Sequence, residues 1–163
     1  MRRLVDGLIA LIIVALVIAA AFQARQREQL VFSAVDTALD GDTLFAAGER
    51  LRLEGIDAPE LTQTCGASGE IPCGRQARAA LAGLVGAGVQ CAGTRRDRYD
   101  RPLVRCATRS GDDIAAALVA RGFALADGCC RAEEAAARAA ARGLWRAPFQ
   151  RPVDWRRDNR SAT

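Results

Sequence analysis

Histidine and lysine are both absent from this chain of 163 residues. Without histidine, imidazole general acid–base catalysis, a Ser-His-Asp triad, a histidine-dependent ribonuclease mechanism and a histidine-ligated metal nuclease are all excluded. Carboxylates and arginine remain as the groups able to support polar chemistry. The 23 basic residues are all arginine, and the formal net charge is +4. A cationic surface favours polyanions such as nucleic acid or anionic lipid, although an all-arginine set also reflects genomic composition.

Pairs of cysteines separated by two residues are also missing, which argues against a zinc site with four cysteine ligands. An even set of cysteines without histidine partners instead favours disulfides in an oxidising, extracytoplasmic compartment. The six cysteines are Cys65, Cys73, Cys91, Cys106, Cys129 and Cys130.

Two pairings are expected. Cys91 and Cys106 lie on two predicted strands of one hairpin, and Cys65 and Cys73 bracket a glycine-rich loop. The adjacent pair, Cys129 and Cys130, is left with three alternatives: a vicinal disulfide, free thiols or a cross-link between chains.

Residues 4–22 form an apolar run that is interrupted by Asp6 and Gly7 and preceded by Arg2 and Arg3. A membrane-spanning helix needs about 20 apolar residues and a signal-peptide core about 7–15, so the run fits either. We expect residues 1–22 to be an uncleaved signal anchor rather than a cleaved signal peptide. Residues 23–29 are then a linker, and the protein is anchored to the cell membrane on its outer or periplasmic side, or secreted if the segment is cleaved.

The remaining residues, about 135, suit one compact domain. Alternating apolar residues and turn signals predict five strands and three helices, an α+β fold of the five-stranded oligonucleotide-binding (OB) barrel type. The strands are expected at 28–36, 43–46, 50–56, 89–94 and 102–108, and the helices at 74–85, 112–121 and 131–142.

Asp40, Asp42, Asp57 and Glu60 gather with Arg52 in residues 39–60. Asp40-Gly41-Asp42 predicts a tight turn in which Gly41 permits a positive φ, and Pro59 ends the strand that contains Arg52. Alone, Asp-Gly-Asp-Thr indicates a solvated hairpin turn. Carboxylates are ligands for hard cations, and a guanidinium matches phosphate oxygens, so the whole segment indicates a metal-assisted phosphodiester site.

The combination resembles the staphylococcal nuclease family. The Asp-Gly-Asp-Thr turn is followed by Arg52 and Asp57-Ala58-Pro59-Glu60, and two further elements lie at 97–101 and 142–145. The resemblance covers about residues 30–157, and residues 158–163 are expected to be a flexible tail.

The resemblance implies a calcium site and a phosphate site. Metal ligands would be Asp42, Asp57 and the Ala58 carbonyl, with Asp40 acting through water. Glu60 would position or deprotonate the attacking water, and Arg52 and Arg101 would hold the phosphate. Tyr99 and Arg98 would contact the substrate. These residues imply calcium-dependent hydrolysis of DNA or RNA by a monomer, leaving 3′-phosphates.

Two positions depart from the family pattern. Asp100 stands where glycine is common, and we expect its carboxylate to point to solvent. Asp127-Gly128 stands where some members have aromatic side chains, which predicts weaker base stacking. The alternative functions are a non-catalytic nucleic-acid or envelope-associated module, or an accessory role in polysaccharide metabolism.

Overall fold

The computed structural model describes residues 2–27 and 30–159 and separates into two units, Met1–Leu30 and Val31–Thr163. The first unit contains helix α1 (Arg2–Arg27). In the described residues, no helix has both the length and the apolar character that crossing a membrane requires. Residues 23–27 of the predicted linker are helical. Residues 28–29 of the linker and 160–163 of the predicted tail lie outside the described residues.

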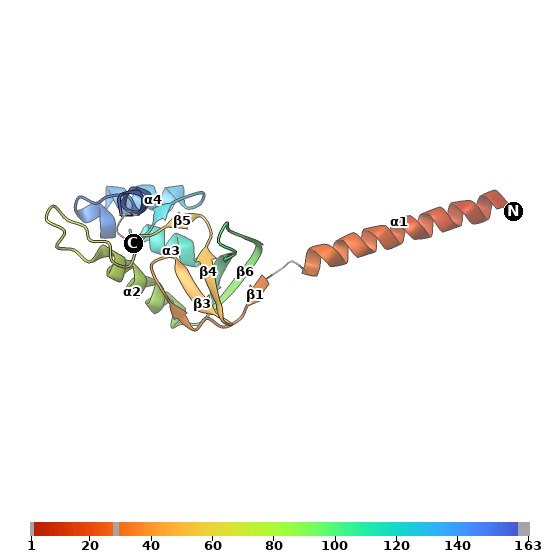
Figure 1. The fold of residues 1–163 in the computed structure, drawn as a ribbon, viewed down its shortest axis with the longest axis horizontal. Helices are drawn as coiled ribbons and strands as arrows, with labels where there is room; N and C mark the ends of the chain where they lie inside the picture. Colours follow the sequence, from red (N-terminus) through yellow and green to blue (C-terminus); the bar gives the residue numbers. More distant parts are fainter. Residues whose placement is uncertain (1, 28–29, 160–163) are drawn as a thin grey trace. The chain divides into compact units, whose positions relative to one another are not determined.

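The second unit contains a six-stranded sheet with strand order β1-β6-β7-β4-β3-β2 (Figure 1). The pairs β2–β3, β3–β4 and β6–β7 are antiparallel, whereas β4 runs parallel to β7. The strands are β1 (Leu30–Phe32), β2 (Thr37–Ala38), β3 (Thr43–Ala46), β4 (Glu49–Leu53), β6 (Val89–Arg96) and β7 (Pro102–Thr108). A separate ladder joins β5 (Ile56–Asp57) to β8 (Leu125–Ala126).

The five-strand prediction is therefore wrong for the described part of the chain, which has eight strands. The predicted first strand is interrupted after Phe32 and resumes at Thr37 as a separate strand. The predicted third strand breaks at Gly55, whose φ of 83° is incompatible with a continuous strand. Its last residues then pair with β8 instead of β7.

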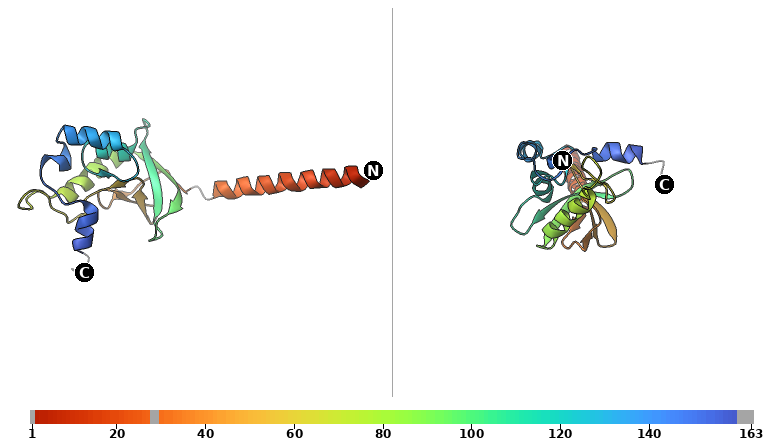
Figure 2. Two further views of the ribbon diagram at one scale, coloured as in Figure 1. Left: turned by 90° about the horizontal axis from the view of Figure 1, so that it is seen from above. Right: turned by 90° about the vertical axis from the view of Figure 1, so that its left-hand side faces the viewer.

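Helices gather at one side of the sheet (Figures 1 and 2). They are α2 (Cys73–Val85), α3 (Ile114–Ala120), α4 (Arg131–Ala139), the 3₁₀ turn η1 (Gly143–Arg146) and α5 (Pro152–Asp158). Helix α3 begins inside the predicted range because the Asp113 carboxylate caps it by accepting the Ala116 N–H at 3.0 Å.

Helix α4 ends before the predicted Arg142. Ala141 adopts a φ of 48°, and the Arg142 N–H donates to the Ala137 carbonyl at 2.9 Å, which together close a Schellman motif. The motif turns the chain towards η1. Helix α5 was not predicted, although Pro152 at its first position is a recognised start signal.

The apolar core lies between the sheet and the helices. Leu44, Leu51 and Val104 from the strands meet Leu81 and Leu118 from α2 and α3, all with no exposed surface. Burying such side chains contributes about 1.5–3 kcal/mol each. This packing fixes the ends of β3, β4 and β5 relative to one another.

The structure contains the two expected disulfides, Cys65–Cys73 and Cys91–Cys106. Cys91 and Cys106 are direct partners in the β6–β7 register, with Cα atoms 4.0 Å apart. For the third pair, the structure has the vicinal disulfide Cys129–Cys130 among the alternatives. All six cysteines are thus oxidised.

Candidate active site

The predicted metal-binding carboxylates lie together at the start of β3 and at β5. The Asp42 Oδ2 atom accepts the Ala58 backbone N–H at 2.9 Å, although the two residues are 16 positions apart. The Asp40 Oδ1 atom accepts the Asp42 N–H at 3.0 Å. Asp42 and Asp57 are both buried. The turn before β3 is thereby tied to the chain that leaves β5.

Gly41 is required here by packing and not by its φ, which is not positive, so the expected reason for this glycine is wrong. A Cβ atom at Gly41 would lie 2.6 Å from the Ala58 Cβ and 2.7 Å from the Ala77 Cβ. Any side chain would push the Asp40–Asp42 segment away from β5 and α2. The glycine therefore permits the close approach that brings the aspartates together.

Arg52 projects from β4 between Asp42 and Asp57. Its guanidinium forms an ion pair with Asp42 and donates to the Asp57 Oδ1 atom at 3.3 Å and the Ile56 carbonyl at 3.1 Å. Charge-assisted hydrogen bonds of this kind are stronger than neutral ones, and they orient the planar guanidinium. Three predicted site residues, Asp42 just before β3, Arg52 on β4 and Asp57 on β5, are thus in direct contact.

The Asp42 carboxyl carries an electrostatic cost. Burial, with a smaller contribution from the neighbouring charge of Asp40, raises the pKa of Asp42 to about 6, against the opposing effects of Arg52 and the Ala58 N–H. Negative charge at this position is therefore undercompensated. A cation placed beside these oxygens would relieve that cost.

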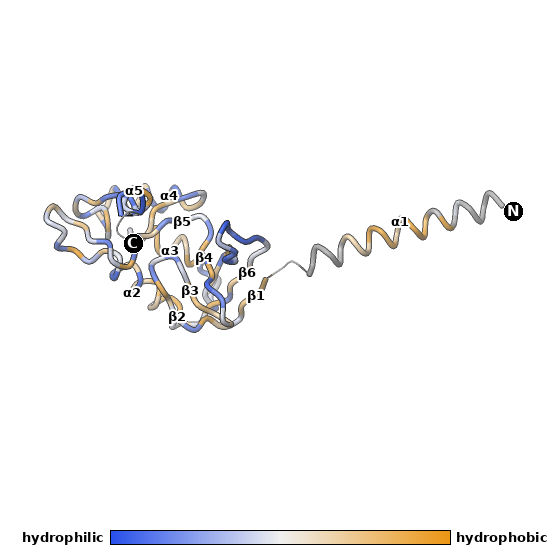
Figure 3. Tube along the Cα trace, in the orientation of Figure 1, coloured by the Kyte–Doolittle hydropathy of each residue, from blue (hydrophilic) through white to orange (hydrophobic). Residues whose placement is uncertain are grey.

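The turn between β6 and β7 supplies the second arginine. Arg101 donates to Asp97 through its Nε atom at 2.8 Å and pairs with it again through Nη2 at 2.7 Å. The pKa of Asp97 is lowered, because these bonds and the backbone N–H groups of Arg101 and Tyr99 outweigh its burial. Figure 3 shows this turn, beside β6, as a hydrophilic projection.

Tyr99 is 65% exposed, and both Arg98 and Arg101 stack over its ring, with guanidinium carbons 4.8 Å and 5.5 Å from the ring centroid. Asp100 adopts a φ of 63°, the conformation that glycine would hold easily. Its side chain is 88% exposed and its Oδ1 lies 3.8 Å from the Arg96 Nε. The carboxylate thus points to solvent, as expected.

Sequence reasoning missed Arg156, which comes from α5. Its Nη1 donates to the Asp57 Oδ1 at 3.0 Å and to the Glu60 Oε1 at 2.9 Å, while Nη2 donates to the Asp57 Oδ2 at 3.2 Å. These bonds raise the pKa of Arg156 although partial burial alone would lower it. Pro152 could have signalled the helix, but nothing local in the sequence indicates that this arginine reaches Asp57.

These residues line a hollow of about 520 Å³, formed by Asp40, Asp42, Thr43, Arg52, Ala58, Pro59, Glu60, Asp97, Arg98, Tyr99, Arg101 and Arg156. Asp127 and Gly128 instead line a neighbouring hollow with Arg95 and Arg105. Over the described residues, no three carboxylate, histidine or cysteine side chains already form a group that could hold a metal. The arginines occupy the space between the carboxylates.

A sheet covered by helices, with acidic and basic side chains meeting at one strand end, defines a protein of the OB-like class with a polar surface site. Residues 50–147 match the family model described as staphylococcal nuclease homologue. The chain belongs to the staphylococcal nuclease family. The matched segment contains Arg52, Asp57, Glu60 and Arg101, whereas Asp42 and Arg156 lie outside it.

The chain is also similar to the succinoglycan biosynthesis protein ExoI of Rhizobium meliloti (strain 1021). The two are 32% identical over 118 residues, which is 67% of this chain and 62% of that protein. The matched region thus spans less than two thirds of the relative's length.

Gly41→Ala tests the close approach in the turn. Because the added Cβ overlaps two neighbouring methyl groups, we expect a loss of about 1–3 kcal/mol in the free energy of unfolding, measured by urea titration. The matched control is Gly83→Ala, since a Cβ at Gly83 meets nothing within 4 Å and alanine favours the helix. Equal stabilities for the two variants would contradict the packing argument.

The raised pKa of Asp42 predicts a pH dependence of stability. The folded state binds this proton more tightly than the unfolded state, so the unfolding free energy falls as the pH rises from about 4 to 6. In chelator, the difference in unfolding free energy between the wild type and Asp42→Asn should change by about 2 kcal/mol between pH 4 and pH 7. A pH-independent difference would contradict the shift.

Proposed function

We propose that the protein is a calcium-dependent nuclease that hydrolyses phosphodiester bonds of DNA or RNA and leaves 3′-phosphates. The observation that carries this proposal is the meeting of Asp42, Glu60, Arg52 and Arg101 around one hollow, with Asp57 bonded to Arg52 beside it. Family membership supports it, because these are the positions at which the family's metal ligands, water-positioning residue and phosphate-binding arginines are expected.

The donor set fits calcium. Asp42 and Asp57 offer carboxylate oxygens, the Ala58 carbonyl offers a neutral oxygen, and Asp40 is close enough to Asp42 to act through water. The raised pKa of Asp42 indicates that this negative charge is incompletely offset by the protein itself. When bound, calcium would offset charge on the carboxylates and on the phosphate oxygens.

The chain's own residues would supply the remaining chemistry. Glu60 would orient a water and take its proton as the water attacks phosphorus in line. Arg52 and Arg101 would hold the non-bridging phosphate oxygens and stabilise their added charge. The bond from phosphorus to the 5′-oxygen breaks, that oxygen leaves and takes a proton from solvent water, the proton held by Glu60 returns to solvent, and the phosphate stays on the 3′-oxygen.

Arg52 and Arg101 are held by carboxylates rather than exposed on flexible loops. Pairing with Asp42 and Asp57 fixes Arg52, and pairing with Asp97 fixes Arg101. Donors that are fixed before the substrate arrives need no reorganisation during the reaction, which is the basis of electrostatic preorganisation. Asp97 is thereby proposed as a positioning residue for Arg101.

The three disulfides support an extracytoplasmic location, since thiols are kept reduced in the cytosol of most cells. The name of the relative, a succinoglycan biosynthesis protein, favours a second candidate function: an accessory role in envelope polysaccharide synthesis without cleavage of nucleic acid. The intact set of carboxylates and arginines favours catalysis over that alternative.

The direct test is cleavage of single-stranded DNA and RNA by the oxidised full chain, with Ca²⁺ or with chelator. We expect calcium-dependent products that end in 3′-phosphates. Glu60→Gln and Arg52→Ala should each lower kcat/KM by about 10²–10³-fold, because each removes a group that acts in the transition state. Arg131→Ala, an exposed arginine on α4, is the control and should keep full activity.

Nucleic-acid binding without cleavage under any of these conditions would contradict the nuclease proposal. It would leave the non-catalytic module in its place.

Arg156 should weaken calcium binding, because it donates to both oxygens of Asp57 and brings a positive charge to a proposed ligand. We expect Arg156→Gln to tighten Ca²⁺ binding about threefold to tenfold by isothermal titration calorimetry, or about 0.7–1.4 kcal/mol. Arg157→Gln is the control, since Arg157 pairs with Asp154 and Asp158 instead. Weaker calcium binding in Arg156→Gln would show that Arg156 only positions Asp57.

A further inference from the structure

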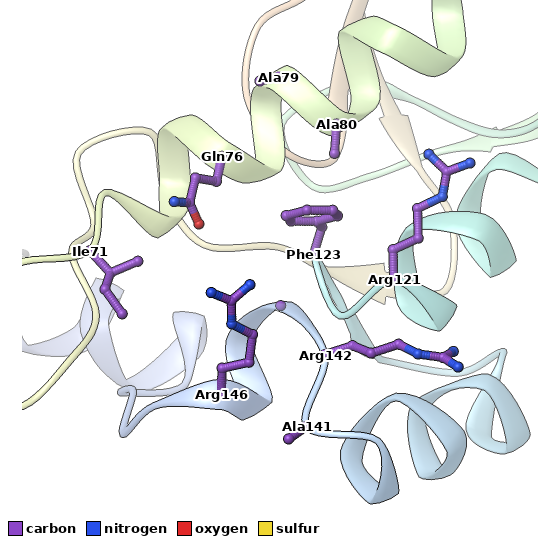
Figure 4. Close-up of a pocket in the computed structure, with 10 residues that line it drawn as sticks. Ile71, Gln76, Ala79, Ala80, Arg121, Phe123, Ala141, Arg142 and Arg146 are labelled. Carbon is purple, nitrogen blue, oxygen red and sulfur yellow. The ribbon is translucent and has the colours of Figure 1, made fainter.

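A cavity larger than the hollow of the candidate active site lies away from that site. It has a volume of about 820 Å³ and shares no lining residue with the hollow that contains the carboxylates. Figure 4 shows its walls: Gln76 and Ala80 of α2 on one side, the Phe123 ring in the middle, and Arg146 of η1 facing Gln76 from the other side. The cavity is thus built from three separate segments.

Helix α2 separates this cavity from the candidate active site. Gly74 and Ala77 face the site, because a Cβ at Gly74 would overlap the Glu60 carbonyl and Ala77 packs beside Gly41. Gln76, Ala79 and Ala80 lie on the opposite side of the helix and line the cavity. A helix with its side chains is about 10–12 Å across, so the two hollows are within reach of one extended ligand.

The walls are held by the backbone. Gly122 and Gly143 both have positive φ, and the Leu144 N–H donates to the Gly122 carbonyl at 2.9 Å. This bond joins the segment with Phe123 to the segment with Arg146. The cavity is therefore a fixed feature of the fold.

Charge in the cavity has one sign. Of the ten described residues that line it, three are arginines, Arg121, Arg142 and Arg146, and none is acidic. Across the described part of the chain, none of these three forms an ion pair, although Arg142 donates to the Ala120 carbonyl at 3.1 Å. Guanidinium groups around an apolar floor complement an anion that has a flat apolar body.

We propose that this cavity is a second binding site for single-stranded nucleic acid, which holds a part of the strand away from the cleaved bond. One base would stack on Phe123 with Gln76 at its polar edge, and the flanking phosphates would contact Arg121 and Arg146. A strand that passes around α2 would reach both hollows. The inference rests on the proposed function for its substrate class, but its test needs no cleavage.

The test is fluorescence anisotropy of a labelled 12-nucleotide DNA and a labelled trinucleotide, with the full chain in chelator. Arg121→Gln/Arg146→Gln should weaken binding of the 12-mer about tenfold or more and lower the slope of log K against log salt by about 1.4, or 0.7 for each lost phosphate contact. Phe123→Leu should weaken it about fivefold or more, because one stacked base is lost. Trinucleotide binding should change less than twofold in both variants.

The matched control is Arg109→Gln/Arg131→Gln, which removes the same charge from two exposed positions outside the cavity. Circular dichroism melting identifies any variant that fails to fold, and the arginine double variant tests the site even if Phe123→Leu does not fold.

An equal loss in the control, or unchanged 12-mer binding in the cavity variants, would overturn the proposal. The proposal would also be overturned if the cavity variants lost binding of an acidic polysaccharide but still bound the 12-mer as the wild type does. If calcium-dependent cleavage persists while the cavity variants bind the 12-mer normally, the nuclease proposal stands and this one fails. If the cavity variants lose binding of the 12-mer and the wild type never cleaves, the binding-site proposal stands and the nuclease proposal fails.

Discussion

The buried Asp42 carboxylate is the interaction on which the candidate site depends. One oxygen accepts the Ala58 N–H, and the other faces Arg52 and the Thr43 hydroxyl, which donates to it at 3.1 Å. Together these contacts join the start of β3, the end of β4 and the exit from β5. Removing the partners of a buried charged group would lower the free energy of unfolding by several kcal/mol, so the folded state requires these contacts.

The same constraint explains why the site is rich in arginine. Burial makes the carboxylates expensive, and guanidinium groups offset the cost with several directed hydrogen bonds each. Arg52 and Arg156 approach Asp57 from different elements, β4 and α5, and share its Oδ1 atom. The arginines thereby allow several carboxylates to lie close together. We propose that calcium and a phosphate bind in this environment.

Much of this site could be predicted from the sequence because its parts are local. Asp40, Asp42, Arg52 and Asp57 follow one another closely in the chain, and strand alternation places them near one another. Arg156 could not be predicted, since its contact with Glu60 spans 96 positions and depends on where η1 and α5 leave the core. The role of Gly41 was also missed, because the methyl of Ala77 that it meets belongs to a separate helix.

The fold shows the same division. The β6–β7 hairpin and helix α2 were predicted nearly to their ends because their hydrophobic patterns are long and regular. The early end of α4 and the division of the third predicted strand at Gly55 depend on single residues with positive φ, which the pattern does not register. The division at Gly55 accounts for one of the three additional strands, and the others come from the interruption after Phe32 and from β8.

The central claim, that these carboxylates and arginines form a calcium and phosphate site, is tested most directly by a crystal structure with Ca²⁺ and a nucleoside 3′,5′-bisphosphate. Our account predicts calcium on Asp42, Asp57 and the Ala58 carbonyl, with Arg52 and Arg101 on the phosphate. A cation bound elsewhere, with Asp42 and Asp57 still paired only to Arg52 and Arg156, would contradict it.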